Sequence, residues 1–299
     1  MCRKTRPTYR LALPLCVLLT IGVAGLAALP PIYAAQRTAV TPAVHALGDE
    51  GTVECWVRLA FEPEILWQRR SGTRITGGSR IPEGVGGTVQ NGVLQVRAAT
   101  ILTLSDKVHS SLGLEWVALQ DMQAPLKPYN GPWALIDRGS GATQILPPLG
   151  TCVTATKDKW HHIALVWRGI HVELYFDGSV IAAHTLGAPW TGKTAAMREM
   201  SLTLGPGLIS VDEVRISRVA HKPGELGYFS AKPLESDKTA VILEDFDTAA
   251  VVDGKIRTAT GFTASEGCSL VDGKWGKAIA LWSLAADQPP AERSHEGGQ

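Results

Sequence analysis

The residues with the clearest chemical potential are two adjacent histidines in the segment Lys159-Trp160-His161-His162. Imidazoles can bind metal ions or act as general bases. Adjacent side chains of a β-strand point to opposite faces of the sheet, so His161 and His162 could not bind one ion from the same face. We therefore expect one imidazole to point inward, with a hydrogen bond to the backbone, and the other to point outward. The chain has no Gly-x-Ser-x-Gly element to support a serine nucleophile.

A second candidate chemistry is sugar binding, because the apolar faces of sugar rings stack on tryptophan and tyrosine beside polar groups. Three of the nine tryptophans lie between glycines and prolines, in segments that we predict to be loops. The candidate ligand contacts are Trp133, Tyr129, Asn130, Trp67 and Trp190. The alternative is that these rings only anchor their loops. Four further tryptophans lie in apolar strands and are predicted core residues: Trp56, Trp160, Trp167 and Trp275.

The elements that would position these residues are predicted to be strands. The chain has 31 glycines and 18 prolines between short apolar runs, which favours strands and turns over long helices. Residues 52–59 alternate, with Val53, Cys55, Val57 and Leu59 on one face. Asp177-Gly178 suits a tight hairpin turn, because both positions tolerate positive φ. We predict an irregular region at 120–150 and strands at 52–59, 92–98, 114–119, 160–167, 172–176, 179–184, 202–204 and 209–216.

The first 35 residues differ in kind from the rest of the chain. Four basic residues precede an uncharged, mostly apolar stretch at 11–29, which is typical of an export signal. The stretch is nearly long enough to span a bilayer, and the cleavage site before Gln36 is imperfect, so an uncleaved membrane anchor stays open. In both cases we expect the body to be exported, hence secreted, periplasmic or anchored to the cell envelope.

Charge and cysteine content narrow the possible partners and scaffolds. Removing four basic residues with the first 35 changes the formal charge from +1 to −3, which gives no electrostatic reason to expect nucleic acid as a partner. If the signal is not cleaved, residues 11–29 are the only expected contact with a membrane. Cys55, Cys152 and Cys268 remain in the body, so at most one internal disulfide can form, and its pairing is open.

Three segments together carry a family resemblance. They are GTVECWVR at 51–58, KWHHIALVW at 159–167 with LYFDG at 174–178, and SVDEVRIS at 210–217. As a set they resemble the laminin-G-like jelly roll of the concanavalin A-like lectin and glucanase superfamily, in the version common in exported bacterial proteins. The resemblance covers about residues 47–226. It implies an all-β fold in which two antiparallel sheets form a jelly-roll sandwich, after an N-terminal signal or anchor helix.

The C-terminal part contains segments that open the fold in other members of this family. They are VILEDFD at 241–247 and GKWGKAIAL at 273–281. Residues 237–284 either complete the same sandwich by circular permutation or open a truncated second repeat. Completion is favoured, because an isolated strand pair would leave its apolar side chains without a partner sheet. The predicted organisation is a signal or anchor at 1–35, a linker at 36–46, the jelly roll at 47–287 and a disordered tail at 288–299.

The resemblance implies a function only in outline. Glucanases of the superfamily carry Glu-x-Asp-x-x-Glu on one strand, which provides the two close carboxylates that retaining hydrolysis needs, and this chain lacks that pattern. We expect a non-catalytic recognition module for carbohydrate or an extracellular glycoprotein. The alternatives are a structural or adhesion scaffold of the cell envelope and, third, a diverged glycoside hydrolase. Some relatives bind calcium at the sandwich rim, so calcium is the one candidate cofactor, at Asp137 and Asp177. The turn at Asp177 explains that residue equally well.

Overall fold

The computed structural model describes residues 38–40, 47–61, 86–90, 93–106, 111–121, 129–137, 142–145, 147, 153–189 and 200–282. The predicted signal or anchor and the predicted tail lie outside these ranges, as does most of the predicted linker. Among the described residues, no helix has the length and hydrophobicity needed to cross a membrane.

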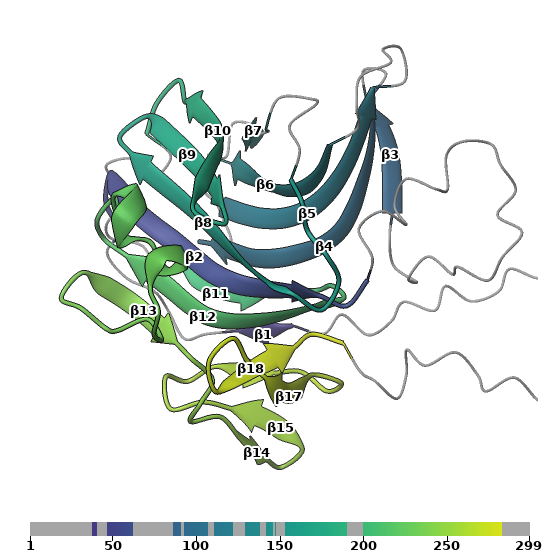
Figure 1. The fold of residues 1–299 in the computed structure, drawn as a ribbon, viewed down its shortest axis with the longest axis vertical. Helices are drawn as coiled ribbons and strands as arrows, with labels where there is room; N and C mark the ends of the chain where they lie inside the picture. Colours follow the sequence, from purple (N-terminus) through teal and green to yellow (C-terminus); the bar gives the residue numbers. More distant parts are fainter. Residues whose placement is uncertain are drawn as a thin grey trace, which may run out of the picture. The chain divides into compact units, whose positions relative to one another are not determined.

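The described residues form two antiparallel sheets, which confirms the predicted all-β sandwich (Figure 1). In the ten-stranded sheet, β3 (Gly86–Gln90) pairs with β4 outside the main path. The main path runs through β14 (Ala250–Val252), β15 (Lys255–Arg257), β16 (Thr263–Ala264), β1 (Ala39–Val40), β11 (Ser201–Leu204), β4 (Val93–Ser105), β5 (Ser111–Asp121), β6 (Tyr129–Asp137) and β7 (Ala142–Ile145).

In the eight-stranded sheet, β13 (Ala240–Glu244) pairs with β12 outside the main path. The main path runs through β10 (Ser179–Thr185), β9 (His171–Phe176), β8 (Trp160–Arg168), β2 (Glu50–Leu59), β12 (Ile209–Ser217), β18 (Lys277–Ala280) and β17 (Ser269–Asp272). Two single 3-10 turns follow β12: η1 (Pro223–Glu225) and η2 (Gly227–Phe229).

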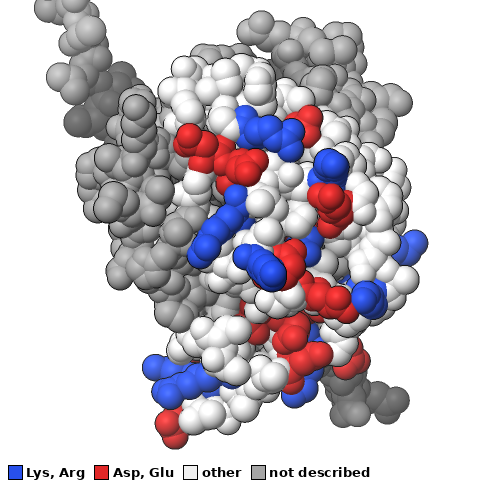
Figure 2. Space-filling view, turned by 90° about the vertical axis from the view of Figure 1, so that its left-hand side faces the viewer, with Lys and Arg blue, Asp and Glu red and all other residues white. Residues whose placement is uncertain are grey.

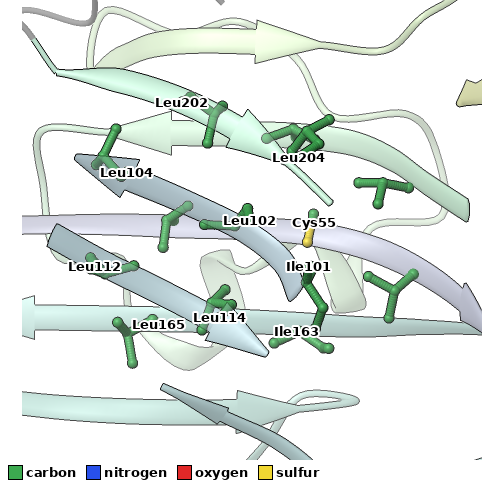
Figure 3. Close-up of a cluster of buried hydrophobic side chains, with 14 of the residues drawn as sticks. Cys55, Ile101, Leu102, Leu104, Leu112, Leu114, Ile163, Leu165, Leu202 and Leu204 are labelled. Atoms are coloured by element: carbon green, nitrogen blue, oxygen red, sulfur yellow. The ribbon is translucent and has the colours of Figure 1, made fainter. Parts of the chain in front are cut away.

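The main core lies between the two sheets (Figure 3). Leucines of β4, β5 and β11 pack there against Cys55 of β2 and Ile163 and Leu165 of β8. The predicted alternation of β2 is confirmed, because Val53, Cys55, Val57 and Leu59 are all buried in this core. A side-chain period of two therefore explains which face of β2 is apolar. Cys55 and Cys268 form no disulfide with each other, and Cys152 lies outside the described residues.

Two predictions about local structure were wrong. Residues 129–137 form β6 instead of an irregular loop, because β5 pairs with the whole strand and β7 pairs with its second half, from Ala134. Of the four tryptophans predicted for the core, Trp167 is there. Trp56 is buried on the outer face of the eight-stranded sheet, while Trp160 and Trp275 are half-buried. Alternation explains Trp56, since the residues of β2 on either side of it point inward.

The C-terminal strands extend both sheets. β12 pairs with β18 through Val211 and with β13 through Ile216, while β16 pairs with β1. Phe246, Phe262 and Ile279 are buried in the core that the two sheets share. In this arrangement residues 240–280 are part of the sandwich.

Candidate functional site

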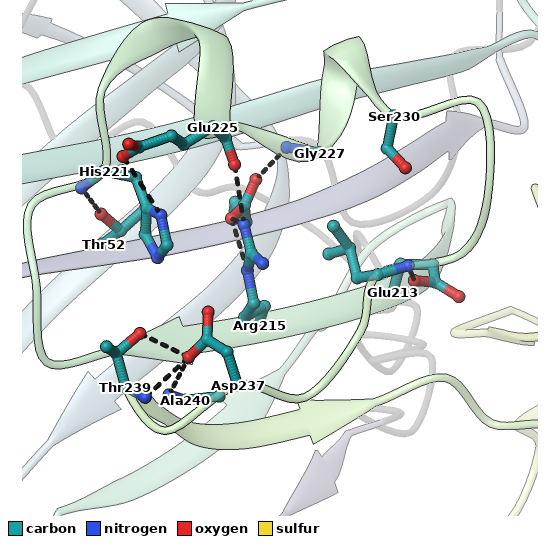
Figure 4. Close-up of polar contacts among 12 residues, drawn as sticks. Thr52, Glu213, Arg215, His221, Glu225, Gly227, Ser230, Asp237, Thr239 and Ala240 are labelled. Carbon is teal, nitrogen blue, oxygen red and sulfur yellow. Dashed lines mark hydrogen bonds and ion pairs between the residues drawn. The ribbon is translucent and has the colours of Figure 1, made fainter.

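A covering segment crosses the outer face of the eight-stranded sheet. We call residues 218–236, which include η1 and η2, the strap (Figure 4). The Thr52 hydroxyl of β2 donates to the Val219 carbonyl at 2.9 Å and accepts from the His221 N–H at 2.9 Å. At the other end, the Leu234 N–H donates to the Glu213 carboxylate at 2.5 Å. Polar groups of β2 and β12 thus hold both ends of the strap.

The middle of the strap is held by a buried charged cluster. Glu54 of β2 is fully buried and lies beside Arg215 of β12 and His162 of β8. Arg215 donates to Oε1 of Glu54 through Nε at 2.8 Å and Nη2 at 2.5 Å, while Nε2 of His162 lies 2.9 Å from Oε2. The Gly227 N–H donates to the same Oε2 at 2.7 Å, and Arg215 also reaches the Glu225 carbonyl at 3.2 Å. Every contact of this carboxylate is therefore internal to the protein.

The electrostatics of Glu54 agree with a structural role. Burial alone would raise its pKa, but the hydrogen bond and charge of His162, the Arg215 guanidinium and the Gly227 N–H together lower the pKa to about 2. A carboxylate held ionised with all its partners in place has no free lone pair aimed at solvent. We interpret the cluster as the attachment that fixes the strap to the sheet.

The two adjacent histidines point to opposite faces, as predicted. His161 faces inward, where Nδ1 lies 2.8 Å from Oδ2 of Asp177 and Nε2 accepts from the Thr156 N–H at 3.4 Å. His162 faces the strap. The backbone N–H of His162 donates to Oδ1 of Asp177 at 2.8 Å. Asp177 has a φ of +45° and uses both carboxylate oxygens to tie its turn to β8.

A groove lies where the strap meets β8, β9 and β10. Its volume is about 440 Å³, within the range of small-molecule sites. The apolar floor includes Val166, which packs with Tyr175 under the strap. The polar lining comprises Arg168, His171, Glu173, Tyr175, Thr185, His184, His221 and Lys222.

The polar side chains of the groove are partly organised by contacts among themselves. The Tyr175 hydroxyl donates to the Glu173 carboxylate at 2.6 Å, and burial followed by this hydrogen bond raises the pKa of Tyr175 well above its ordinary value. The Thr185 hydroxyl lies 3.3 Å from Nδ1 of His171. Arg168 donates to the Ala220 carbonyl of the strap at 3.3 Å. The groove thus holds donors and acceptors in defined positions above the ring of Tyr175, which is itself buried.

Basic and acidic side chains are also mixed on the face of the molecule around the described strands (Figure 2). Figure 2 shows basic and acidic side chains interspersed over one face of the molecule, without a wide area of a single sign. The face in Figure 2 therefore presents no wide positive area to a polyanion. Selectivity at the groove would therefore depend on local contacts.

The sequence-predicted ligand residues that the structure describes lie on the opposite sheet. Trp133 pairs with Glu115 across β6 and β5, and its indole N–H donates to the Glu115 carboxylate at 2.8 Å. Tyr129 lies on the same outer face, with its hydroxyl hydrogen-bonded to the Pro132 carbonyl. Both aromatic rings are buried, at 1% and 0% exposure. A ring buried to this degree has no open face for a sugar in this conformation.

The structure describes only part of the remaining predicted set. The Asn130 side chain accepts from the Trp116 indole N–H at 2.9 Å, while Trp67 and Trp190 lie outside the described residues. Of the two calcium candidates, Asp137 ends β6 and Asp177 forms its turn. Among the described residues, no group of three or more histidines, cysteines, aspartates or glutamates is arranged to hold a metal ion. The five-residue ligand set remains a prediction.

Sequence reasoning did not identify the residues of the groove. A signal was nevertheless present, because β9 alternates, with His171, Glu173 and Tyr175 on the face opposite Val172 and Leu174. The alternation predicts that these three side chains point outward. It cannot predict that the strap, some 45 residues later in the sequence, forms the opposite wall.

No protein-family model matches the sequence, and a search of curated proteins finds no match. Solved structures show a similar overall arrangement. A Bacteroides ovatus protein described as a candidate carbohydrate-binding protein has a TM-score of 0.43 and 12% identity over 77% of this chain and 56% of that chain. A heptameric SAP-like pentraxin from Limulus polyphemus has a TM-score of 0.40 and 10% identity over 85% of this chain and 91% of that chain.

A third structure is domain 4 of the extracellular arabinanase AbnA from Geobacillus stearothermophilus, in complex with arabinotriose. Its TM-score is 0.34 and its identity 16%, over 61% of this chain and 67% of that chain. Likeness at this level says nothing about what this chain binds. The function has to be inferred from the residues of the chain itself.

Proposed function

We propose that the exported body of this protein is a non-catalytic recognition module that binds carbohydrate in the groove between the strap and strands β8, β9 and β10. The observation that carries the proposal is the lining of the groove. The groove of about 440 Å³ is lined by a carboxylate, a guanidinium, an ammonium group and imidazoles, above an apolar floor that contains the buried ring of Tyr175. Sugars present hydroxyl groups around apolar ring faces, so they need this mixture of contacts.

The carboxylates near the groove favour recognition over hydrolysis. Among the described residues that line it, Glu173 is the one carboxylate, and the Tyr175 hydroxyl already donates to it. Retaining hydrolysis uses two carboxyl groups about 5 Å apart, and inverting hydrolysis uses two that are somewhat farther apart. The groove contributes one carboxylate to such a pair, which supports a binding role.

The test is a screen of glycan binding with the full-length protein and two groove variants, Arg168→Gln and Tyr175→Phe. Arg168→Gln removes the guanidinium, and Tyr175→Phe removes the hydroxyl that positions the Glu173 carboxylate. Both substitutions keep most of the side-chain volume. We expect the wild-type protein to bind at least one glycan and each variant to bind it at least about tenfold more weakly, which corresponds to about 1.4 kcal/mol. Isothermal calorimetry would give the affinities, and melting temperatures would show that the variants are folded.

A matched control is Trp133→Phe, which changes the sequence-predicted site on the other sheet. If this variant loses binding while the groove variants keep it, the ligand binds at Trp133 and the groove assignment is wrong. If no glycan binds the wild-type protein, the scaffold alternative replaces the proposal. Release of reducing sugar from a bound polysaccharide would instead favour the diverged hydrolase.

A further inference from the structure

Two exposed aromatic residues lie on the strap beside the groove. Phe229 is 55% exposed and Tyr228 is 39% exposed, which makes them the only exposed aromatic residues of the described chain. Soluble proteins rarely leave adjacent large apolar side chains in water without a use for them. They lie in η2, and Tyr228 comes six residues after the groove residue Lys222.

The aromatic pair is held in a fixed orientation. Tyr228 stacks on the buried Trp56 with ring centroids 6.3 Å apart and an interplanar angle of 28°. Phe229 meets Tyr228 edge to face at 5.2 Å and 88°. Stacking on a buried ring restricts the rotamers of the pair before any ligand arrives. Pre-organised aromatic rings give up little conformational entropy when they bind a partner.

The glycine of the β9–β10 turn makes room for the pair. A Cβ atom at Gly178 would lie 2.5 Å from Cδ1 of Tyr228 and 2.8 Å from Cζ of Phe229, and this residue has a φ of +75°. Only glycine satisfies both conditions without strain. The rings therefore rest directly on the hairpin whose strands line the groove.

The pair lies close to one edge of the groove. Tyr175 lines the groove, and Gly178 lies under the pair three positions later, so their Cα atoms are at most about 11 Å apart. Nζ of Lys274 lies 4.5 Å from the ring centroid of Trp56, which is the ring on which Tyr228 stacks. An aromatic surface next to a hydrogen-bonding cation is suited to one sugar unit.

We propose that Tyr228 and Phe229 form a second sugar-binding position, which takes a further ring of the oligosaccharide whose other end occupies the groove. This inference rests on the proposed function of the groove and narrows it, because a site with two positions prefers an extended oligosaccharide to a monosaccharide or disaccharide. Phe229, the more exposed ring, provides the main stacking face. Tyr228 supports it from the side of Trp56.

The experiment compares disaccharides with hexasaccharides in calorimetric titrations of the full-length protein. The probes are cello-, xylo-, arabino- and galacturono-oligosaccharides. The wild-type protein is expected to bind the hexasaccharide of one series more tightly than the disaccharide. Phe229→Ala should weaken hexasaccharide binding about threefold to tenfold and leave disaccharide binding unchanged. Phe229→Tyr should keep the wild-type affinity, because stacking needs an aromatic ring and not this particular one.

Val251→Ala is the matched control. Val251 of β14 is 66% exposed and lies in the ten-stranded sheet, so losing its apolar surface should change neither affinity. The inference is overturned if Phe229→Ala binds the hexasaccharide as well as the wild type does. It is also overturned if Phe229→Ala alters only the oligomeric state, since the pair would then be a protein contact. If no probe binds the wild-type protein, the proposed function itself fails.

Discussion

The outward-facing residues of both sheets follow the same period-two alternation, but they lie in different environments. On the eight-stranded sheet, outward residues such as Glu54 and Arg215 are covered by the strap and joined to it by charged hydrogen bonds. On the ten-stranded sheet, the outward residues Glu115 and Trp133 are buried and joined to each other. An outward polar residue therefore predicts an exposed surface only where no later segment crosses the strand. The groove exists because the strap covers its own sheet incompletely.

The largest expected effect comes from a change that acts on both sheets. A chain ending at Ser236 lacks β13, β17 and β18 of one sheet and β14, β15 and β16 of the other. It also loses buried Phe246, Phe262 and Ile279. At about 1.5–3 kcal/mol for each large apolar side chain, the loss approaches the total stability of a typical domain. We expect this truncated chain to show no cooperative thermal unfolding in calorimetry, whereas a melting temperature equal to that of the full chain would show that residues 237–299 form a separate repeat.

The next largest effect is expected at the charged cluster under the strap. Glu54→Ala leaves the buried Arg215 guanidinium without its carboxylate and removes the acceptor of the Gly227 N–H. Breaking a buried ion pair from one side costs about 3–5 kcal/mol. We expect a loss of this size in the free energy of unfolding measured with urea. The strap should also become more susceptible to proteolysis, since its central attachment is gone.

The control for this variant lies on the same strand. Glu50 begins β2 and is exposed, so Glu50→Gln should change the unfolding free energy by less than about 0.5 kcal/mol. A similar effect of both substitutions would mean that charge on β2, and not the cluster, determines stability. In that case the strap would not depend on Glu54 for its position.

Much of the fold could be predicted from the sequence, because alternation is a local property. Val53 and Cys55 face the core as the period-two pattern predicts, and His161 and His162 point to opposite faces. The strand at 129–137 was missed because Pro132 and its neighbouring glycine suggested a loop. Proline is tolerated where a strand has a partner on one side only, and Pro132 pairs with Trp116 of β5 but lies before the residues that pair with β7.

The candidate site could be predicted much less well. Which tryptophans are accessible depends on segments that are distant in the sequence, as Trp133 beside Glu115 and Trp56 beneath Tyr228 both show. The groove likewise needs β9 and the strap together. No residue spacing within β9 or within the strap predicts that the two segments lie side by side. A sequence can therefore indicate which residues point outward and still leave open which of them reach solvent.

A smaller effect is expected on the outer face of the ten-stranded sheet. Trp133→Phe keeps an aromatic ring and removes the N–H that donates to the Glu115 carboxylate at 2.8 Å. Hydrogen bonds to charged groups contribute about 1.5–3 kcal/mol. We expect a loss of about 2 kcal/mol in the unfolding free energy measured with urea. Tyr129→Phe removes a bond to the neutral Pro132 carbonyl and should cost only about 1 kcal/mol. An equal cost for both variants would contradict the difference in charge between the two acceptors.

The smallest effect on stability is expected from a change of pH. It acts in the middle of β12, between the residues that pair with β18 and those that pair with β13. Asp212 accepts from the Lys274 N–H at 2.7 Å and the Trp275 N–H at 3.2 Å, and the next residue, Glu213, holds the strap through Leu234. Burial raises the pKa of Asp212 to about 7, and the charge of Glu213 acts in the same direction. The backbone hydrogen bonds from Trp275, Lys274 and Glu213 lower this pKa but do not outweigh burial. Burial, with the charges of Asp245 and Asp247, raises the pKa of Glu213 to about 7 as well.

Between about pH 4 and pH 7, Asp212 and Glu213 are therefore protonated in the folded state and ionised in the unfolded state. The stability that these protons contribute is complete below about pH 4 and is lost as the pH rises through 7. Glu54 acts in the opposite sense, because its pKa is lowered to about 2 and its contribution is lost as the pH falls from about 4.5 to 2. His221, whose pKa is lowered by burial and by the charge of Arg215, also opposes acid stabilisation below its ordinary value of 6.5.

Asp212→Asn separates these contributions, because the amide does not titrate and its one oxygen can still accept from the Lys274 and Trp275 N–H groups. The acceptor of the Glu213 N–H is lost at every pH, so this loss does not change the slope. Between pH 5 and 8 the melting temperature of the wild type should fall more steeply than that of the variant, by the equivalent of about 1–2 kcal/mol. Differential scanning fluorimetry over this range measures both slopes. Glu213→Gln should flatten the wild-type slope in the same way, because its carboxyl group titrates in the same window. Parallel slopes for the wild type and both variants would mean that these two carboxylates are ionised in the folded protein at pH 5, and that backbone donors alone neutralise the junction between the strap and the C-terminal strands.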